Sequence, residues 1–280
     1  MRIPFSVYLM PVYWFALSVA DGYTWWRAAV VFLILHVLVY PASNGYNSYH
    51  DRDEGSIGGL RQPPKVTQEL FHLVLFFDAL ALLLSFFVSP LFALAVALYL
   101  LVSKAYSNRD IRLKKYPVIS TLVVTVFQGA FTFLMVQLGA DLDWQQILQA
   151  PNSWFALVST LFLCGSYPLT QIYQHQEDAE RGDKTLSLLL GIRGTFVFAG
   201  IALGLGATLL VGLYLALGQL QSILVFLVCT APITYYFLSW VRRSWQNTGE
   251  VNFENTMRMN KISSLCISLA FFLILILRSV

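Results

Sequence analysis

The chain has 280 residues, of which 57% are hydrophobic and only 12% are charged. Soluble globular domains carry about 25% charged residues, so a water-soluble fold is excluded. Intrinsic disorder is excluded as well, because 21 Phe, 14 Tyr and 7 Trp residues cannot stay hydrated in an unfolded segment. The mean hydropathy of +0.64 therefore indicates a helical protein that crosses a membrane several times.

Nine apolar runs follow one another along the chain, and each is long enough, or nearly so, to cross a bilayer as a helix of about 20 residues. In chain order they cover residues 4–20, 25–44, 70–88, 91–105, 117–138, 154–173, 195–217, 220–241 and 262–278. We therefore expect an all-α membrane protein: one domain, residues 1–280, forming a bundle of nine transmembrane helices.

The basic residues predict the orientation, since lysine and arginine concentrate in the cytoplasmic loops of membrane proteins. With a cytoplasmic N-terminus, nine helices place all but Arg27 and Arg278 of the 18 lysines and arginines on the cytoplasmic side. The net charge of +3 then reflects membrane insertion, and no nucleic-acid partner is expected. The sequence predicts a multi-pass protein of a bacterial-type inner membrane, with its long polar loops facing the cytoplasm.

Polar side chains gather at the end of the second predicted helix. Asn47 and Asp51 lie four residues apart, so a helix that continues to Asp51 presents both on one face. Asp53 and Glu54 supply further carboxylates just beyond that helix. Mg²⁺ prefers a few such oxygen ligands and fills its other positions with water and substrate phosphates. This segment therefore predicts half of a magnesium site.

A second polar cluster ends the sixth predicted helix and repeats the same spacing. Gln174 and Asp178 again place an amide and a carboxylate four residues apart. Glu177 and Arg181 flank this pair, and Gly182 predicts the end of the helix. Two acidic helix ends on one membrane face repel each other unless a cation lies between them. A diphosphate bridged by Mg²⁺ fits this need, because the metal neutralises oxygens of both protein and phosphate.

Basic side chains near both clusters are candidates for binding a diphosphate. Arg112 and Lys114 lie on the loop between the fourth and fifth predicted helices. Arg61 and Lys65 lie on the first cytoplasmic loop, and Arg181 stands beside the second cluster. A guanidinium group binds phosphate as a fork, and an ammonium group binds it as a point charge.

Polar side chains also fall within the predicted helices, where an ionisable group is a functional candidate by default. Asp78 lies near the middle of the third predicted helix, too deep for a metal site at the cytoplasmic face. We expect it to be paired inside the bundle. Gln128 and Gln137 lie within the fifth predicted helix.

Three segments together resemble the UbiA superfamily of intramembrane prenyltransferases. The first family motif, Asn-x3-Asp-x3-Asp, is matched by Asn47 and Asp51. Gly55 occupies its third position, so Asp53 or Glu54 would have to replace that carboxylate.

The second family motif, Asp-x3-Asp-x3-Gly followed closely by Thr-Leu, is matched by Asp178, Gly182 and Thr185-Leu186. Its leading aspartate is Gln174 here, and Glu177 is the candidate substitute. A third family pattern, Tyr-Ser-x4-basic-Leu-Lys, is matched by Tyr106, Ser107, Arg112, Leu113 and Lys114.

The resemblance implies a nine-helix bundle that transfers an isoprenyl group from a prenyl diphosphate to a lipophilic acceptor, with Mg²⁺ assisting ionisation of the diphosphate. By their places in the motifs, Asn47, Asp51 and Asp178 would carry the catalysis. An allylic cation develops at C1 of the prenyl chain, and aromatic faces can stabilise it. The tyrosines placed for this role are Tyr49, Tyr106 and Tyr173.

Two other readings of the same residues stay open. A membrane terpene cyclase would ionise the same diphosphate and quench the cation within its own chain. A non-catalytic bundle for lipid binding or transport would explain the hydropathy equally well, but not the repeated amide and carboxylate pairs. For a transferase, the acceptor stays open among an aromatic acid, a quinone precursor, a tetrapyrrole, a carotenoid and a glycerolipid, as does the oligomeric state.

Overall fold

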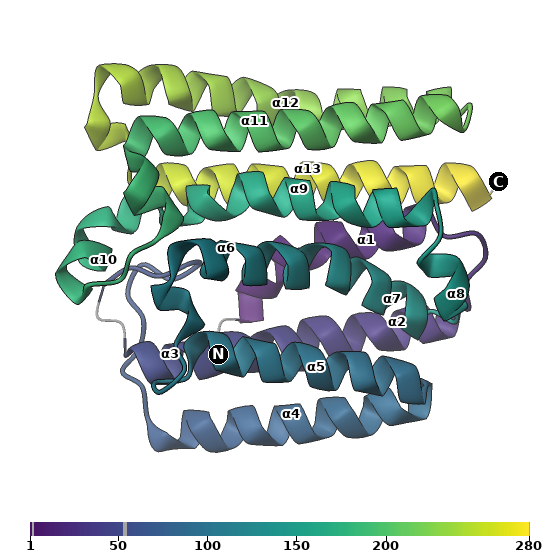
Figure 1. Cartoon of the computed structure of the whole chain (residues 1–280), viewed down its shortest axis with the longest axis horizontal. Coiled ribbons are helices and arrows are strands. Elements are labelled where there is room, and N and C mark those ends of the chain that lie inside the picture. The colour runs from purple at the N-terminus through teal and green to yellow at the C-terminus, as the bar shows by residue number, and fades with distance from the viewer. Residues whose placement is uncertain (2, 53–54, 280) are drawn as a thin grey trace.

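A computed structural model of the chain describes residues 1, 3–52 and 55–279. The long helices lie roughly parallel to one another, and the described residues form no β-strand (Figure 1). In chain order the elements are η1 (Ile3–Leu9), α1 (Met10–Ser18), α2 (Trp25–Leu33), η2 (Ile34–Val39), α3 (Tyr40–Asp51), α4 (Gln68–Val88), α5 (Pro90–Ser107), η3 (Leu113–Lys115), α6 (Pro117–Val126), η4 (Phe127–Phe131), α7 (Thr132–Gly139), α8 (Trp144–Ile147), α9 (Asn152–Gln171), η5 (Ile172–Gln174), α10 (His175–Arg181), α11 (Leu186–Ala216), α12 (Leu220–Gln246), η6 (Thr248–Glu250) and α13 (Phe253–Ser279).

In the described parts of the chain, eight helices are long and apolar enough to cross a membrane. Three of them are rods built from consecutive elements, namely Trp25–Asp51, Pro117–Gly139 and Asn152–Glu180. The first predicted span is instead a shorter apolar helix, Phe5–Ser18. Large apolar side chains such as Phe87, which is 74% exposed, cover the outer surface and suit contact with lipid. The predicted all-α membrane bundle is confirmed: within the described residues, the short first helix together with the eight long ones makes up the predicted nine.

The two ends of the bundle differ as the partition of basic residues predicts. The loops that follow α3, α5, α10 and α12 lie together at one end, on the left in Figure 1. Arg27 and Arg278, the two basic residues not expected on the cytoplasmic side, lie at the opposite end of the bundle. There Arg278 donates to Asp21 at 2.6 Å, and Arg27 forms an ion pair with Asp141.

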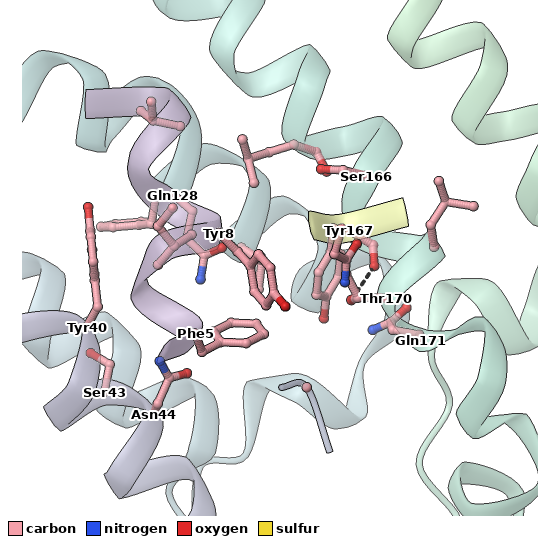
Figure 2. A pocket seen from close by; sticks show the side chains of 18 of the residues that line it. Phe5, Tyr8, Tyr40, Ser43, Asn44, Gln128, Ser166, Tyr167, Thr170 and Gln171 are labelled. Carbon is pink, nitrogen blue, oxygen red and sulfur yellow. Dashed lines mark hydrogen bonds between the residues drawn. The ribbon is translucent and has the colours of Figure 1, made fainter. Parts of the chain in front are cut away.

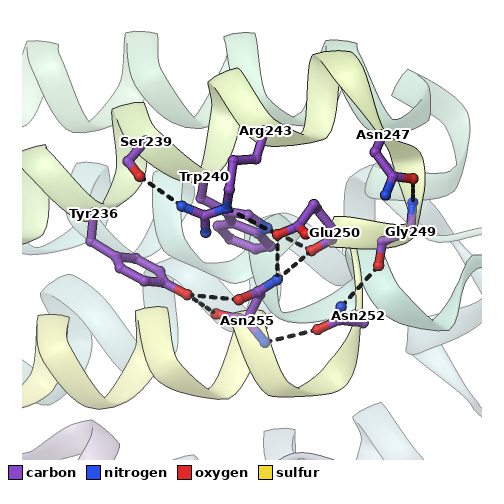
Figure 3. Close-up of polar contacts among 9 residues, drawn as sticks. All are labelled: Tyr236, Ser239, Trp240, Arg243, Asn247, Gly249, Glu250, Asn252 and Asn255. Carbon is purple, nitrogen blue, oxygen red and sulfur yellow. Dashed lines mark hydrogen bonds and ion pairs between the residues drawn. The ribbon is translucent and has the colours of Figure 1, made fainter.

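The hairpin of α12 and α13 is closed by a polar network at the loop-rich end (Figure 3). Arg243 Nε donates to Glu250 Oε2 at 2.9 Å, and Trp240 Nε1 donates to the Glu250 carbonyl at 2.9 Å. Asn255 Nδ2 donates to that same carbonyl, and Tyr236 donates to the Asn255 side chain. The last helix is thereby held in register with the helix before it.

Asp78 is paired inside the bundle, as its depth in the sequence predicts. Its carboxylate on α4 accepts from Lys104 Nζ on α5. The same ammonium group lies 5.1 Å from the centre of the Tyr46 ring on α3. This buried pair therefore supports the helix that carries the first motif.

Candidate active site

One face of α3 carries the first motif. Asn47 and Asp51 both line a cavity inside the bundle, and the face continues inward through Asn44 and Tyr40. Since these residues are three, four or seven positions apart, an α-helix places them on one side. The helix ends directly after Asp51, where Arg52 adopts a left-handed conformation with φ 50°.

The second motif lies across the cavity on the rod formed by α9, η5 and α10. Gln174 and Asp178 line the cavity from this side. Gly182, with φ 72°, ends α10 as the sequence predicts. Thr185 then caps α11 by accepting from the Leu188 N–H at 3.2 Å, and its hydroxyl donates to Asp178 Oδ2 at 3.2 Å.

The segment after the first motif packs against the second motif. Gln174 Nε2 donates to the Ser56 carbonyl at 3.1 Å, and the Tyr173 hydroxyl donates to the same carbonyl at 3.4 Å. The Glu177 carboxylate lies against Gly55, where a Cβ atom would stand only 2.7 Å from Oε2. The two clusters that the sequence placed on separate helices are therefore neighbours.

The basic loop between α5 and α6 supplies one cation to the first motif and one to Asp183, which lies between Gly182 and Thr185 of the second. Lys114 Nζ pairs with the Asp51 carboxylate, and these side chains are only 14% and 11% exposed. Arg112 Nη2 donates to both carboxylate oxygens of Asp183, at 2.9 and 3.0 Å. Both predicted diphosphate ligands on this loop are thus paired with acidic side chains. From α5, the Ser107 hydroxyl donates to Asn47 Oδ1 at 2.7 Å and so orients that amide.

The cavity between the motifs has a volume of about 410 Å³, within the range of small-molecule sites. Its charged side chains come from the two motifs, the basic loop and the segment after α10: Asp51, Lys114, Asp178 and Asp183. Aromatic rings line much of the remainder, and Phe5 and Tyr8 of η1 reach into it between two polar walls (Figure 2). The arrangement offers anionic oxygens and a cation at one end and apolar surface beyond.

The three predicted tyrosines occupy different surroundings. Tyr106 lines the cavity, and its hydroxyl lies 2.7 Å from that of Tyr167. The Tyr49 ring lies 4.9 Å from Phe71, and the Tyr173 ring lies 5.6 Å from Phe253. Of the three, the cavity brings only Tyr106 to its wall.

The remaining predicted site residues lie beyond the cavity wall or beyond what the structure describes. Arg61 is exposed and pairs with Glu254 at 3.1 Å, and Lys65 is exposed on the same loop. Asp53 and Glu54 lie outside the described residues, and of Arg181 the structure describes only the backbone.

The donor set determines which metal chemistry the site can support. Among the described residues, no three His, Cys, Asp or Glu side chains come together as a cage for an ion. The two motifs instead present the carboxylates of Asp51 and Asp178 and the amides of Asn47 and Gln174 to the cavity, while Asp183 is paired with Arg112. Mg²⁺ is commonly held by one or two carboxylates together with substrate phosphates. These residues therefore fit Mg²⁺ bound together with a diphosphate.

The family model for the UbiA prenyltransferase family matches residues 8–262, which is most of the chain. The chain belongs to the UbiA prenyltransferase family. A search of curated protein sequences finds no match.

Solved structures agree with this family in their fold. The substrate-free UbiA homologue from Aeropyrum pernix K1 has a TM-score of 0.75 at 16% identity, and the alignment covers 100% of both chains. A UbiA homologue from Archaeoglobus fulgidus bound to dimethylallyl diphosphate and Mg²⁺ has a TM-score of 0.65 at 19% identity, covering 97% of this chain and 96% of the other. A digeranylgeranylglyceryl phosphate synthase has a TM-score of 0.60 at 18% identity, covering 98% and 94%.

Several cavity residues escaped the sequence interpretation of this UbiA family member. Asp183 pairs with Arg112, although no family motif includes it. Asn44 and Tyr40 extend the face of Asn47 at helical spacing, and that spacing was a usable signal. Tyr167 gave no such signal, because a tyrosine in an apolar run is most simply read as packing.

Proposed function

We propose that this UbiA family member transfers an isoprenyl group from a prenyl diphosphate to a lipophilic acceptor, within a single domain over residues 1–280. The observation that supports this most directly is the cavity. Its oxygen ligands from both motifs and Lys114 lie at one end, and its aromatic lining lies beyond. The A. fulgidus homologue structures with Mg²⁺ and either dimethylallyl or geranyl diphosphate support the same assignment.

In this proposal the diphosphate lies at the motif end. Asn47, Asp51, Gln174 and Asp178 would hold Mg²⁺, with Glu177 contributing from α10 and Asp53 and Glu54 from the adjoining segment. When bound, Mg²⁺ neutralises the diphosphate oxygens on which charge develops. Lys114 and Arg112 would exchange their carboxylate partners, Asp51 and Asp183, for phosphate oxygens, and Arg61, Lys65 and Arg181 would attract the anion to the loop-rich end.

The bond changes follow from this placement. The bond between C1 of the prenyl chain and the diphosphate oxygen breaks, and its electron pair leaves with the diphosphate. A nucleophilic atom of the acceptor donates an electron pair to C1 and forms the new bond. The acceptor loses one proton, which leaves with the diphosphate. Aromatic faces such as Tyr106 stabilise the cation at C1, with Tyr49 and Tyr173 shaping the surrounding wall.

The distribution of basic residues supports a location for the site. Because the loops with most basic residues lie at the motif end, we place that end in the cytoplasm of a cell with a bacterial-type inner membrane. A water-soluble diphosphate then enters from the cytoplasm, and the lipophilic acceptor enters from the bilayer.

The test is the thermal stability of the detergent-purified protein with geranyl diphosphate, with and without MgCl₂. A ligand that binds only the folded state raises stability by RT ln(1 + [L]/Kd). We expect a Mg²⁺-dependent rise that Asp178→Asn abolishes and that Glu254→Gln, a change at an exposed ion pair, preserves. Absence of any rise in the unaltered protein would refute the proposal.

A second assay separates transfer from cyclisation. Labelled geranyl diphosphate is incubated with Mg²⁺, either alone or with a lipid extract as the source of acceptor. A transferase forms labelled product only with the extract. Release of a terpene hydrocarbon or alcohol without any acceptor would instead assign the protein as a cyclase.

A further inference from the structure

A polar strip on α3 extends the first motif into the interior of the bundle. Asp51, Asn47, Asn44, Ser43 and Tyr40 all line the cavity from this helix. The twelve residues from Tyr40 to Asp51 are separated end to end by about 16 Å of helix. The strip therefore reaches well past the diphosphate end, to a depth at which a prenyl slot needs only apolar side chains.

At the inner end of the strip, two hydroxyl groups make no hydrogen bond within the described part of the protein. The Tyr40 side chain is 1% exposed, and its hydroxyl has no hydrogen-bond partner. The Thr132 hydroxyl, which lies beside that of Tyr40, donates to the Phe127 carbonyl at 2.7 Å. The Ser43 hydroxyl likewise has no partner. Buried polar groups are nearly always hydrogen-bonded, so such exceptions point to a ligand or to function.

The rod Pro117–Gly139 contains a local irregularity that places a further amide beside the polar strip of α3. The π-helical turn η4 contains Gln128, which lines the cavity, and π-turns are frequent at functional sites. The Ala130 N–H donates to Thr160 Oγ1 at 3.0 Å, which satisfies a donor of the irregular turn. Figure 2 shows Gln128 on the same side of the cavity as Tyr40, Ser43 and Asn44. The side-chain amides of Asn44 and Gln128 each offer both a hydrogen-bond donor and an acceptor.

The polar wall differs from the diphosphate end in that it has no charged side chain among the described residues. Of the described residues that line the cavity, Lys114 is the only Lys or Arg, and it pairs with Asp51. An acceptor with a carboxylate or phosphate next to the polar wall would bury that charge without a counter-ion, at a large cost in free energy. A neutral acceptor carries no such cost.

Part of the cavity lining is apolar and suits the donor. Val12 and Phe15 of α1 and Ile267 and Phe271 of α13 belong to this part. The Phe15 and Phe271 rings stack with their centres 4.3 Å apart. A prenyl chain packs on this apolar part, which leaves the polar strip to the second substrate.

We propose that the strip of Tyr40, Ser43 and Asn44, together with Gln128, is the acceptor site, and that the acceptor is an uncharged molecule bearing hydroxyl or carbonyl groups. This assignment rests on the proposed transferase function and specifies its second substrate. Among the classes open from the sequence, it favours a neutral phenol or quinol and disfavours aromatic acids and phosphate-bearing lipids.

The experiment compares acceptor pairs that differ by one carboxylate. The detergent-purified protein is first saturated with geranyl diphosphate and MgCl₂, and the rise in melting temperature verifies the donor site. Binding and prenylation are then measured for 4-hydroxybenzamide against 4-hydroxybenzoate, and for 1,4-dihydroxynaphthalene against its 2-carboxylate. We expect each neutral compound to bind at least about tenfold more tightly than its acid partner, a difference of one decade in Kd.

Two variants locate the binding site. Gln128→Leu is expected to weaken binding of the neutral compounds about tenfold, the loss of a hydrogen bond or two, while leaving the donor-induced rise unchanged. Tyr40→Phe is expected to weaken it less. The matched controls are Gln219→Leu, an amide at the other end of the bundle, and Tyr214→Phe. Tyr214 is also fully buried with an unpartnered hydroxyl, but it lies outside the cavity wall.

The outcomes are distinct. Equal or tighter binding of the acids, unchanged affinity in Gln128→Leu, or no binding of any neutral compound by a protein that binds the donor would each overturn the acceptor assignment. A protein that does not bind geranyl diphosphate with Mg²⁺ would overturn the transferase function itself, and the acceptor assignment with it.

Discussion

The carboxylate of Glu177 occupies the space into which a side chain at position 55 would project. A Cβ atom on Gly55 would lie 2.7 Å from Glu177 Oε2 and 2.9 Å from Oε1, closer than real Cβ contacts allow. Position 55 is where the family motif has an aspartate, and α10 brings the carboxylate of Glu177 to the same place. The missing acid of one motif is thus replaced, in space, by an acid that adjoins the other.

This relationship predicts the effect of restoring the family residue. Gly55→Asp adds a side chain and a second negative charge where Glu177 already lies, so we expect a loss of stability of about 1–3 kcal/mol, typical of overpacking. The double variant Gly55→Asp with Glu177→Ala is expected to recover most of that loss. Melting temperatures and the Mg²⁺-dependent donor shift measure both effects.

The control is Gly58→Asp, which changes a neighbouring glycine whose added Cβ would meet the Phe5 ring first. Glu177→Ala should not rescue this variant. If it did, or if Gly55→Asp alone were as stable as the unaltered protein, the spatial replacement would be wrong.

The ion pair of Asp51 and Lys114 predicts that metal and diphosphate bind together. In the proposed function Asp51 turns to Mg²⁺ and Lys114 to a phosphate, so either ligand alone must separate a buried pair. We expect the rise in melting temperature with both ligands to exceed the sum of the rises with MgCl₂ alone and geranyl diphosphate alone.

Lys114→Met isolates this coupling. Removing one partner of a buried pair costs about 3–5 kcal/mol, so the variant should melt earlier. Without Lys114, Asp51 should then respond to MgCl₂ alone more than it does in the unaltered protein. Lys115→Met, at the exposed neighbouring position, is the control and should change neither quantity. Strictly additive shifts in the unaltered protein would contradict the coupling.

The pair of Asp78 and Lys104 predicts a structural rather than chemical role. Asp78→Asn keeps the shape but leaves the ammonium group uncompensated inside the bundle, and we expect a loss of about 3–5 kcal/mol. Glu254→Gln at the exposed pair with Arg61 should cost at most about 1 kcal/mol. Thermal unfolding in detergent compares the two, and equal effects would contradict the assignment of Asp78 to the interior.

Gly129 predicts how closely α9 and η4 must approach. A Cβ at this position would lie 2.7 Å from Thr160 Cα, a backbone atom that cannot turn aside. Gly129→Ala should therefore destabilise the bundle by about 1–3 kcal/mol. Gly204→Ala, at a helical glycine with nothing within 4 Å, should instead stabilise it by about 0.5–1 kcal/mol through its better helix propensity. A stable Gly129→Ala variant would mean that the two rods can separate.

The sequence by itself determined the helices, the end of the bundle that carries the basic loops, and the faces on which Asn47, Asp51, Gln174 and Asp178 lie. These features are local. Helix formation in a membrane follows from an apolar run, because every backbone polar group must bond within its own segment. Residues four apart then share a face through helix geometry alone.

Only the tertiary structure decided which groups meet. Lys114 and Arg112 pair with Asp51 and Asp183, Glu177 takes the place of a side chain at position 55, and Gln128 joins the strip of α3. Each contact joins segments far apart in the chain. The distances between these segments depend on side-chain packing and on Gly129, which permits the close approach of α9 and η4. The π-helical turn η4 also carries Gln128. No spacing within a single helix carries that information.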